Sequence, residues 1–175
     1  QVAAGGDVAA LERRLRAGAR IELPAGSDLV LRAGDQWLMG IESGTSLTLP
    51  AIPGRWFSRQ ARGAVDAGEI RMSTAPAFHG AALALATPEA EVRVTGTTLA
   101  VICESGGTCV CVIEGTVRMG ARRGAPALAP VAAGMRGYAF ADGRPMMQTT
   151  MRADEVPALG ALRERRRALL EARAR

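Results

Sequence analysis

The sequence contains no Lys and no Asn, and aromatic residues make up only 3% of its 175 positions. All 22 basic side chains are therefore Arg, and because both absent residues have AT-rich codons, a GC-rich genome accounts for this bias. No apolar run approaches the roughly 18 residues that a transmembrane helix needs. The chain opens on Gln1 without an initiator Met, as a processed secretory product or part of a longer chain does.

The composition favours one β-rich domain. A chain of this length can bury a real core, and with 48% hydrophobic residues but few aromatics, Ala, Val and Leu must build it. Clusters of Gly and Pro indicate frequent turns. Between them apolar residues alternate with polar or small ones, as in half-buried strands, at Ile21 and Leu23, Leu29 and Leu31, and Leu47 and Leu49. The pattern predicts an all-β fold, either a sandwich or a β-helix-like stack of short strands.

Short helices are expected at both ends of the β domain. Asp7 is a suitable N-cap for a helix over 8–17, and Asp154 for a second helix that tolerates Pro157 in its first turn. We therefore expect three parts: an N-terminal helical segment (1–19), a β domain (20–152) and an Arg-rich C-terminal helix (153–175).

The segment from Leu99 to Ile113 is apolar on both faces, which is typical of a hairpin buried on both sides. Its three cysteines are Cys103, Cys109 and Cys111. A three-residue loop at 105–107 would place Cys103 opposite Cys109, with Cys111 on the same face. Three interpretations stay open: buried apolar residues, one disulfide beside a free thiol, or a thiol cluster that binds metal or senses redox state.

No catalytic residue, metal site or cofactor is predicted. The sequence has no P-loop, dinucleotide fingerprint, zinc-protease motif or nucleophile elbow, and its acidic residues are scattered. His79 is the only His, and it is distant in sequence from the cysteines. The sequence indicates no nucleophile or acid that could act with it in catalysis. We expect a protein that is not an enzyme and has no small-molecule substrate.

Two segments are candidates for a partner surface. The first combines aromatic and Arg side chains, which are enriched at interface hot spots: Trp56, Phe57, Arg59 and Arg62. Its aromatic residues could instead plug one end of the core. The second is the basic face of the C-terminal helix, which includes Arg163, Arg166 and Arg167. This face suits solvent, an acidic partner or an anionic membrane surface; nucleic acid is not predicted, because no aromatic residues are interleaved for base stacking.

Residues 83–140 resemble the FecR domain in three motifs that occur in the family's order. They are Val92-Arg93-Val94-Thr95-Gly96-Thr97-Thr98-Leu99-Ala100-Val101 after Thr87-Pro88, Val110-Cys111-Val112-Ile113-Glu114-Gly115-Thr116-Val117, and Val131-Ala132-Ala133-Gly134-Met135. The segment Ala25-Gly26-Ser27-Asp28-Leu29 is similar to an earlier family motif, more loosely. One departure is Leu99, where the family commonly has Phe.

The resemblance implies a function as well as a fold. FecR domains are the periplasmic parts of bacterial iron-responsive anti-sigma regulators. We therefore expect a non-enzymatic sensory or scaffold module in the bacterial envelope that binds protein partners. Any membrane anchor is expected in a segment outside this chain. The alternative is a structural accessory subunit of a membrane-associated complex. Gly96, Gly115 and Gly134 are expected at strand reversals, with Glu114 bonding backbone amides in its turn.

Overall fold

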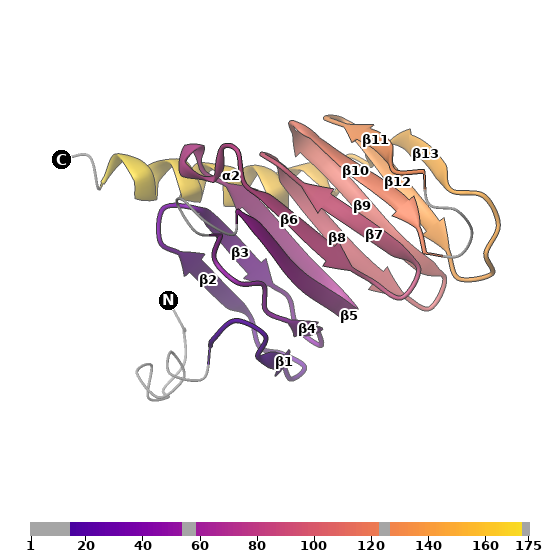
Figure 1. Cartoon of the computed structure of the whole chain (residues 1–175), viewed down its shortest axis with the longest axis horizontal. Coiled ribbons are helices and arrows are strands. Elements are labelled where there is room, and N and C mark those ends of the chain that lie inside the picture. The colour runs from indigo at the N-terminus through magenta and orange to yellow at the C-terminus, as the bar shows by residue number, and fades with distance from the viewer. Residues whose placement is uncertain (1–14, 54–58, 123–126, 173–175) are drawn as a thin grey trace.

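The computed structural model describes residues 15–53, 59–122 and 127–172 of the chain (Figure 1). Two β-sheets pack face to face, and the helix α2 (Val156–Glu171) lies across the outer face of one of them. The all-β prediction is confirmed: the two sheets are joined through β5 into one continuous 13-stranded, nearly closed sheet around the core.

Sheet A is the sheet that α2 does not cover. Its strands, in spatial order, are β1 (Arg20–Glu22), β4 (Ser46–Thr48), the first half of β5 (Gln60–Thr74), β6 (Ala82–Ala86), β7 (Ala90–Val94), β10 (Thr116–Ala121) and β11 (Ala129–Ala132). All pairings in it are antiparallel except β5 with β6, which are parallel and are connected through a short 3₁₀ helix, η1 (Pro76–Phe78).

Sheet B lies between sheet A and α2. Its strands, in spatial order, are β2 (Leu29–Ala33), β3 (Trp37–Ile41), the second half of β5, β8 (Thr98–Glu104), β9 (Gly107–Glu114), β12 (Met135–Phe140) and β13 (Met147–Thr150). The predicted burial of the 99–113 hairpin on both faces is confirmed, because β8 and β9 contact sheet A on one side and α2 on the other.

The strand β5 belongs to both sheets. Its residues 60–67 pair with β4 and β6, and its residues 68–74 pair with β3 and β8. Gly68 lies at the change of sheet with φ +83°, and a Cβ atom there would lie 2.6 Å from Thr45 Cα. Only Gly has both the backbone conformation and the size that this crossing requires.

The second half of the chain alternates between the sheets one hairpin at a time. The hairpins β6–β7 and β10–β11 lie in sheet A, and β8–β9 and β12–β13 in sheet B. Gly96, Gly115 and Gly134 lie in the three connections that cross between the sheets. The turn expected at Glu114–Gly115 is therefore a sheet crossing rather than a hairpin, since β9 pairs with β8 and β12 and not with β10.

The core fills the space between the sheets and draws on both of them. Its fully buried members include Leu47, Val92 and Met119 from sheet A and Met39, Ile70 and Val110 from sheet B. Sulfur-containing side chains occupy part of the volume that aromatic rings fill in other cores, as Met can because its flexible side chain adapts to irregular gaps.

Of the two predicted helices, only the C-terminal one is present in the described residues. Residues 8–14 of the N-terminal helix lie outside the described residues, and the described end of that segment, Leu15–Ala17, is not helical. The C-terminal helix is present with Pro157 in its first turn, but Asp154 is not its N-cap. That position is taken by Glu155, and the Asp154 carboxylate pairs with Arg152 instead.

Candidate interaction surface

A groove of about 920 Å³ runs between α2, the β2–β3 hairpin and the segments around Leu15 and Leu49. Its apolar walls include Leu31, Trp37, Ile52 and Leu169. The indole of Trp37 is only 6% exposed and lies in the floor, whereas Ile52 at the rim is 58% exposed, more than any other large hydrophobic residue of the described chain. An exposed apolar side chain beside a concave apolar surface is typical of a binding site.

Arg side chains surround this groove. Arg16, Arg32 and Arg165 line it, and none of the three guanidinium groups forms an ion pair with a described residue. No acidic side chain among the described residues lines this wide part of the groove, and Asp35 lines its narrow end. The groove is therefore apolar inside and positively charged at its edge, a combination that attracts an acidic ligand with an apolar segment.

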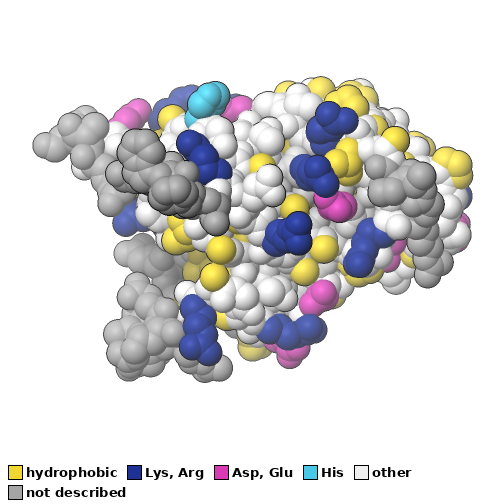
Figure 2. All heavy atoms as spheres, viewed as in Figure 1, with side chains coloured by type: hydrophobic (Ala, Val, Ile, Leu, Met, Phe, Trp, Pro, Cys, Tyr) yellow, Lys and Arg dark blue, Asp and Glu magenta, His cyan; other side chains and the backbone are white. Residues whose placement is uncertain are grey.

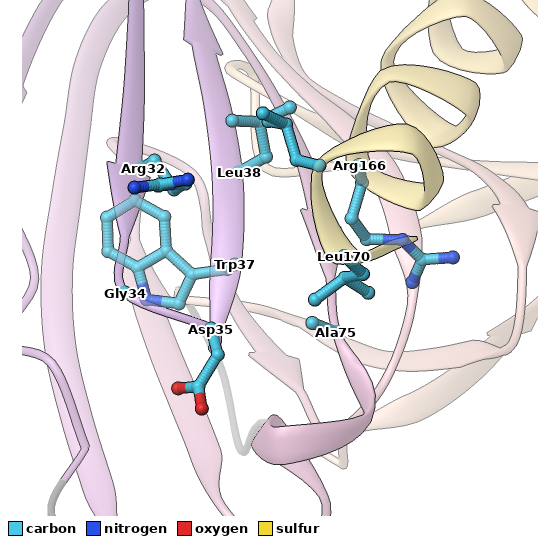
Figure 3. Close-up of a pocket in the computed structure, with 9 residues that line it drawn as sticks. Arg32, Gly34, Asp35, Trp37, Leu38, Ala75, Arg166 and Leu170 are labelled. Atoms are coloured by element: carbon cyan, nitrogen blue, oxygen red, sulfur yellow. The ribbon is translucent and has the colours of Figure 1, made fainter. Parts of the chain in front are cut away.

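The narrow end of the groove lies between sheet B and the last turns of α2 (Figure 3). There Arg32 and Trp37, on neighbouring strands, lie opposite Arg166 and Leu170 of the helix. The space between them is about 20 Å³, roughly that of one water molecule, so any binding of a larger group must use the wider part.

Neither Arg59 nor Arg62 of the first predicted partner surface lines this groove. Trp56 and Phe57 lie outside the described residues. The Arg59 guanidinium donates to the backbone carbonyl of His79, and Arg62 is exposed in the sheet A half of β5. On the face shown in Figure 2, Arg side chains lie singly or in small groups rather than in one continuous basic patch.

The second predicted surface, on α2, divides into two kinds of residue. Arg163 and Arg167 point outward and share the carboxylate of Glu164, at 3.3 and 3.2 Å. Arg166 points inward: it is 16% exposed, donates to the backbone carbonyl of Thr74, and lies 3.5 Å from Glu114 Oε2. Arg166 therefore joins the helix to the sheet and is not available to a partner.

Glu114 has a different role from the one expected. Its Oε2 accepts a 2.9 Å hydrogen bond from the Thr98 hydroxyl and lies near Arg166; no bond from its carboxylate to a turn amide is found in the described chain. The carboxylate thus connects β8, the end of β9 and α2, which is a structural role for this motif residue.

The predicted arrangement of the three cysteines is wrong in one respect. The hairpin loop contains two residues, Ser105–Gly106, so Cys103 faces Thr108 and not Cys109. A shift of one residue reverses the face on which every side chain of a strand lies. The Cys103 thiol consequently points into the sandwich, where it donates to the Val65 carbonyl at 3.4 Å, and Cys109 and Cys111 face α2.

The Cys109 and Cys111 sulfur atoms lie 3.7 Å apart, and all three cysteines are free thiols. Burial raises the pKa of Cys103 to about 11, so this thiol is protonated and unreactive near neutral pH. The hydrogen bond with Cys111 lowers the pKa of Cys109, and the same contact together with burial raises the pKa of Cys111. Cys109 is therefore the more acidic thiol of the pair.

The groove could not be read from the sequence, because its walls come from residues far apart in the chain. Trp37 is one of only two Trp residues and follows the turn at 33–35, which is a signal for a buried aromatic anchor near a hairpin. Nothing in the sequence indicates that Leu169, more than 130 positions later, packs beside it. None of the helices in the described part of the chain could span a membrane.

Comparison with known proteins gives the family. A family model described as FecR protein matches residues 12–118, about three fifths of the 175 positions. The chain therefore belongs to the FecR family. The match begins well before residues 83–140, which contain the three sequence motifs of the family. No curated protein sequence matches the chain.

Two crystal structures share the fold. Both are of a candidate anti-sigma factor from Parabacteroides distasonis ATCC 8503, at 1.65 and 2.50 Å resolution. Each has a TM-score of 0.65 and 17% sequence identity, and the match covers 79% of this chain. It spans 63% and 62% of the two solved chains, so this chain is equivalent to only part of that protein.

Proposed function

We propose that this chain is the non-catalytic sensory module of an anti-sigma-type regulator, acting outside the cytoplasm by binding a segment of another protein. Membership of the FecR family supports a regulatory signalling role. The observation that carries the binding mode is the groove beside Trp37, with its apolar walls and three Arg residues that form no ion pair with a described residue.

The occupant that suits this groove is a protein segment with apolar side chains flanked by acidic ones. Apolar side chains would replace water against Leu31, Trp37 and Ile52, and this burial supplies most of the affinity. Carboxylates would lie at the rim next to Arg16, Arg32 and Arg165, where they would speed association and fix the orientation of the segment.

The groove is also a better candidate than the outer face of α2. Arg163 and Arg167 on that face are already paired with Glu164, which reduces the charge that they offer to an anionic membrane or partner. An accessory subunit held only by basic contacts would need a stronger basic patch than this helix presents.

The test is affinity purification of the tagged full-length protein from its native membranes, followed by mass spectrometry. We expect to recover a sigma factor or an outer-membrane transporter. The double variant Arg32→Glu/Arg165→Glu should reduce recovery of the transporter by roughly tenfold or more, because it turns attraction into repulsion at the groove rim.

The matched control is Arg93→Glu/Arg118→Glu, which makes the same change of net charge at two exposed residues of sheet A, away from the groove. It should leave recovery unchanged. Equal loss from the control and from Arg32→Glu/Arg165→Glu would refute the groove as the binding site. Stoichiometric recovery of a membrane complex with neither a sigma factor nor a transporter would refute the regulatory role in favour of an accessory subunit.

A further inference from the structure

A second cluster of functional groups lies on the opposite side of sheet B from the core, under the start of α2. Cys109 and Cys111, two residues apart on β9, point to this side together, and their exposed fractions are 2% and 0%. Glu155, the N-cap of α2, points towards them, with its side chain 11% exposed. The two sulfur atoms and a carboxylate oxygen all lie within 4.8 Å of one another.

We propose that Cys109, Cys111 and Glu155 form a binding site for a zinc ion. Zinc in proteins takes thiolate and carboxylate ligands in tetrahedral geometry. With Zn–S bonds of about 2.3 Å and a tetrahedral angle, the two sulfur atoms must be about 3.8 Å apart. The separation of Sγ atoms in this protein is 3.7 Å, so the strand already holds both thiols at the spacing that the ion requires.

A cavity of about 190 Å³ adjoins the cluster and supplies the rest of the coordination sphere. It is lined by Cys111 and Glu155 together with Ala158 and Leu159 of α2. It is large enough for several water molecules, one of which would be the fourth ligand. The cavity also gives the ion a route from solvent, which two thiols of 2% exposure or less would not have by themselves.

The surroundings suit the charge of the site. Two thiolates, one carboxylate and Zn²⁺ carry a net charge of about −1, and Arg136 Nη1 lies 3.1 Å from Glu155 Oε1 to offset it. The backbone N–H of Arg152 donates to the other oxygen, Oε2, at 2.8 Å. Ligating carboxylates in metal sites are commonly oriented by such outer partners.

The geometry disfavours an intrastrand disulfide. Residues i and i+2 of a strand are about 6.6–6.8 Å apart at Cα, which is at the upper limit of the range that disulfides span. A metal ion bridges the two sulfur atoms without drawing their backbones together. Of the three cysteines predicted to share a face, Cys109 and Cys111 lie together, beside a carboxylate that sequence spacing does not suggest.

Binding would join β9 to the N-terminus of α2, so the ion would hold the helix on sheet B. This inference is independent of the proposed partner groove, which lies towards the other end of the helix around Arg165 and Leu169. Failure of either proposal leaves the other unchanged.

The first measurement is titration of the reduced full chain with Zn²⁺ against a chromophoric chelator, with Co²⁺ as a spectroscopic probe. We expect one ion per chain and a thiolate-to-cobalt charge-transfer band. The double variant Cys109→Ser/Cys111→Ser should lose the band and weaken zinc binding by more than roughly 100-fold. Glu155→Gln should weaken binding by roughly tenfold and alter the visible cobalt bands, which a purely structural role for Glu155 would not do.

Cys103→Ala is the matched control, because this thiol lies on the other face of the same sheet and should not affect binding. A second readout needs no variant: bound zinc should protect Cys109 and Cys111 of the unaltered chain from alkylation, as mapped by mass spectrometry, and removal of zinc by a chelator should restore their reactivity. Zinc binding that is equal in wild type and the double serine variant, or alkylation unaffected by zinc, would overturn the proposal.

Discussion

Gly115 and Gly134 have nearly the same backbone conformation in very different surroundings, and this contrast makes a quantitative prediction. Their φ angles are +79° and +80°. A Cβ atom at Gly134 would meet nothing within 4 Å, whereas one at Gly115 would overlap the carbonyl oxygen of Gly96 and lie 2.9 Å from Thr97 Cγ2. Both Gly→Ala variants therefore incur the left-handed backbone cost, and only Gly115→Ala also incurs a steric one.

The magnitudes follow from these two terms. The positive φ costs an Ala roughly 1 kcal/mol, so Gly134→Ala should lower the free energy of unfolding by about that amount. Overlap with a backbone atom that cannot turn away adds about 1–3 kcal/mol, so Gly115→Ala should lose about 2–4 kcal/mol in total. The difference between the two variants measures the steric cost of placing a Cβ atom where the Gly115 connection packs against the Gly96 connection.

Urea denaturation monitored by circular dichroism measures this difference. With a slope of about 2 kcal/mol per molar urea, the midpoint should fall by about 0.5 M for Gly134→Ala and by about 1–2 M for Gly115→Ala. An unchanged slope in both variants would show that only stability has changed. Equal midpoints for the two variants would refute the packing of the Gly96 and Gly115 connections against each other.

Three further results are expected. Leu159→Ala should lower the free energy of unfolding by about 2–5 kcal/mol, because Leu159 is 1% exposed under α2, whereas Val156→Ala, at a residue 46% exposed, should cost less than about 0.5 kcal/mol; similar losses would contradict the docking of this helix. Burial in the fold raises the pKa of Cys103 from 9.0 to about 11, so between these pH values unfolding releases the thiol proton. The contribution of Cys103 to the free energy of unfolding is therefore fully present below about pH 9 and is lost as the pH rises to about 11. Wild type should lose about 1.3 kcal/mol more than Cys103→Ala between about pH 8 and about pH 10, and parallel pH profiles would exclude this assignment. Glu114→Gln should weaken the contact with Arg166 and speed proteolysis within α2 by a few-fold, with Glu164→Gln as the exposed control; equal cleavage of both variants would argue against the link.

The sequence predicts the hairpins of this fold better than their arrangement. Apolar residues on both faces of 99–113 indicate burial on both sides, and the sandwich provides it. The cysteine register was missed, because a loop of two residues or three is consistent with the same Gly-rich turn, and the choice reverses the faces of the strand.

The longest strand, β5, was not predicted, for a physical reason. Its buried apolar residues fall on odd numbers in the first half, at Ala61 and Val65, and on even numbers in the second, at Ile70 and Met72. The change of parity occurs where the strand passes from sheet A to sheet B, so no single alternation extends along it. Pattern recognition that assumes one buried face per strand cannot find such an element.

The two candidate sites were hidden for a simpler reason. The groove combines Trp37 with Leu169, and the thiol pair is completed by Glu155, which is more than 40 positions away in the chain. These contacts depend on where α2 packs on sheet B. The spacing of Leu residues in this segment predicts a helix, but it does not predict the surface on which the helix packs.

The sharing of β5 between the two sheets also has a consequence for how the molecule comes apart. Neither sheet can separate from the other while the hydrogen bonds on both halves of this strand persist. Partial opening is thereby restricted to the peripheral hairpins and α2, and loss of the centre is a single cooperative event in which both layers melt together. A protein built this way can loosen its helix or an outer hairpin in response to a ligand and still keep the frame that positions its binding surfaces.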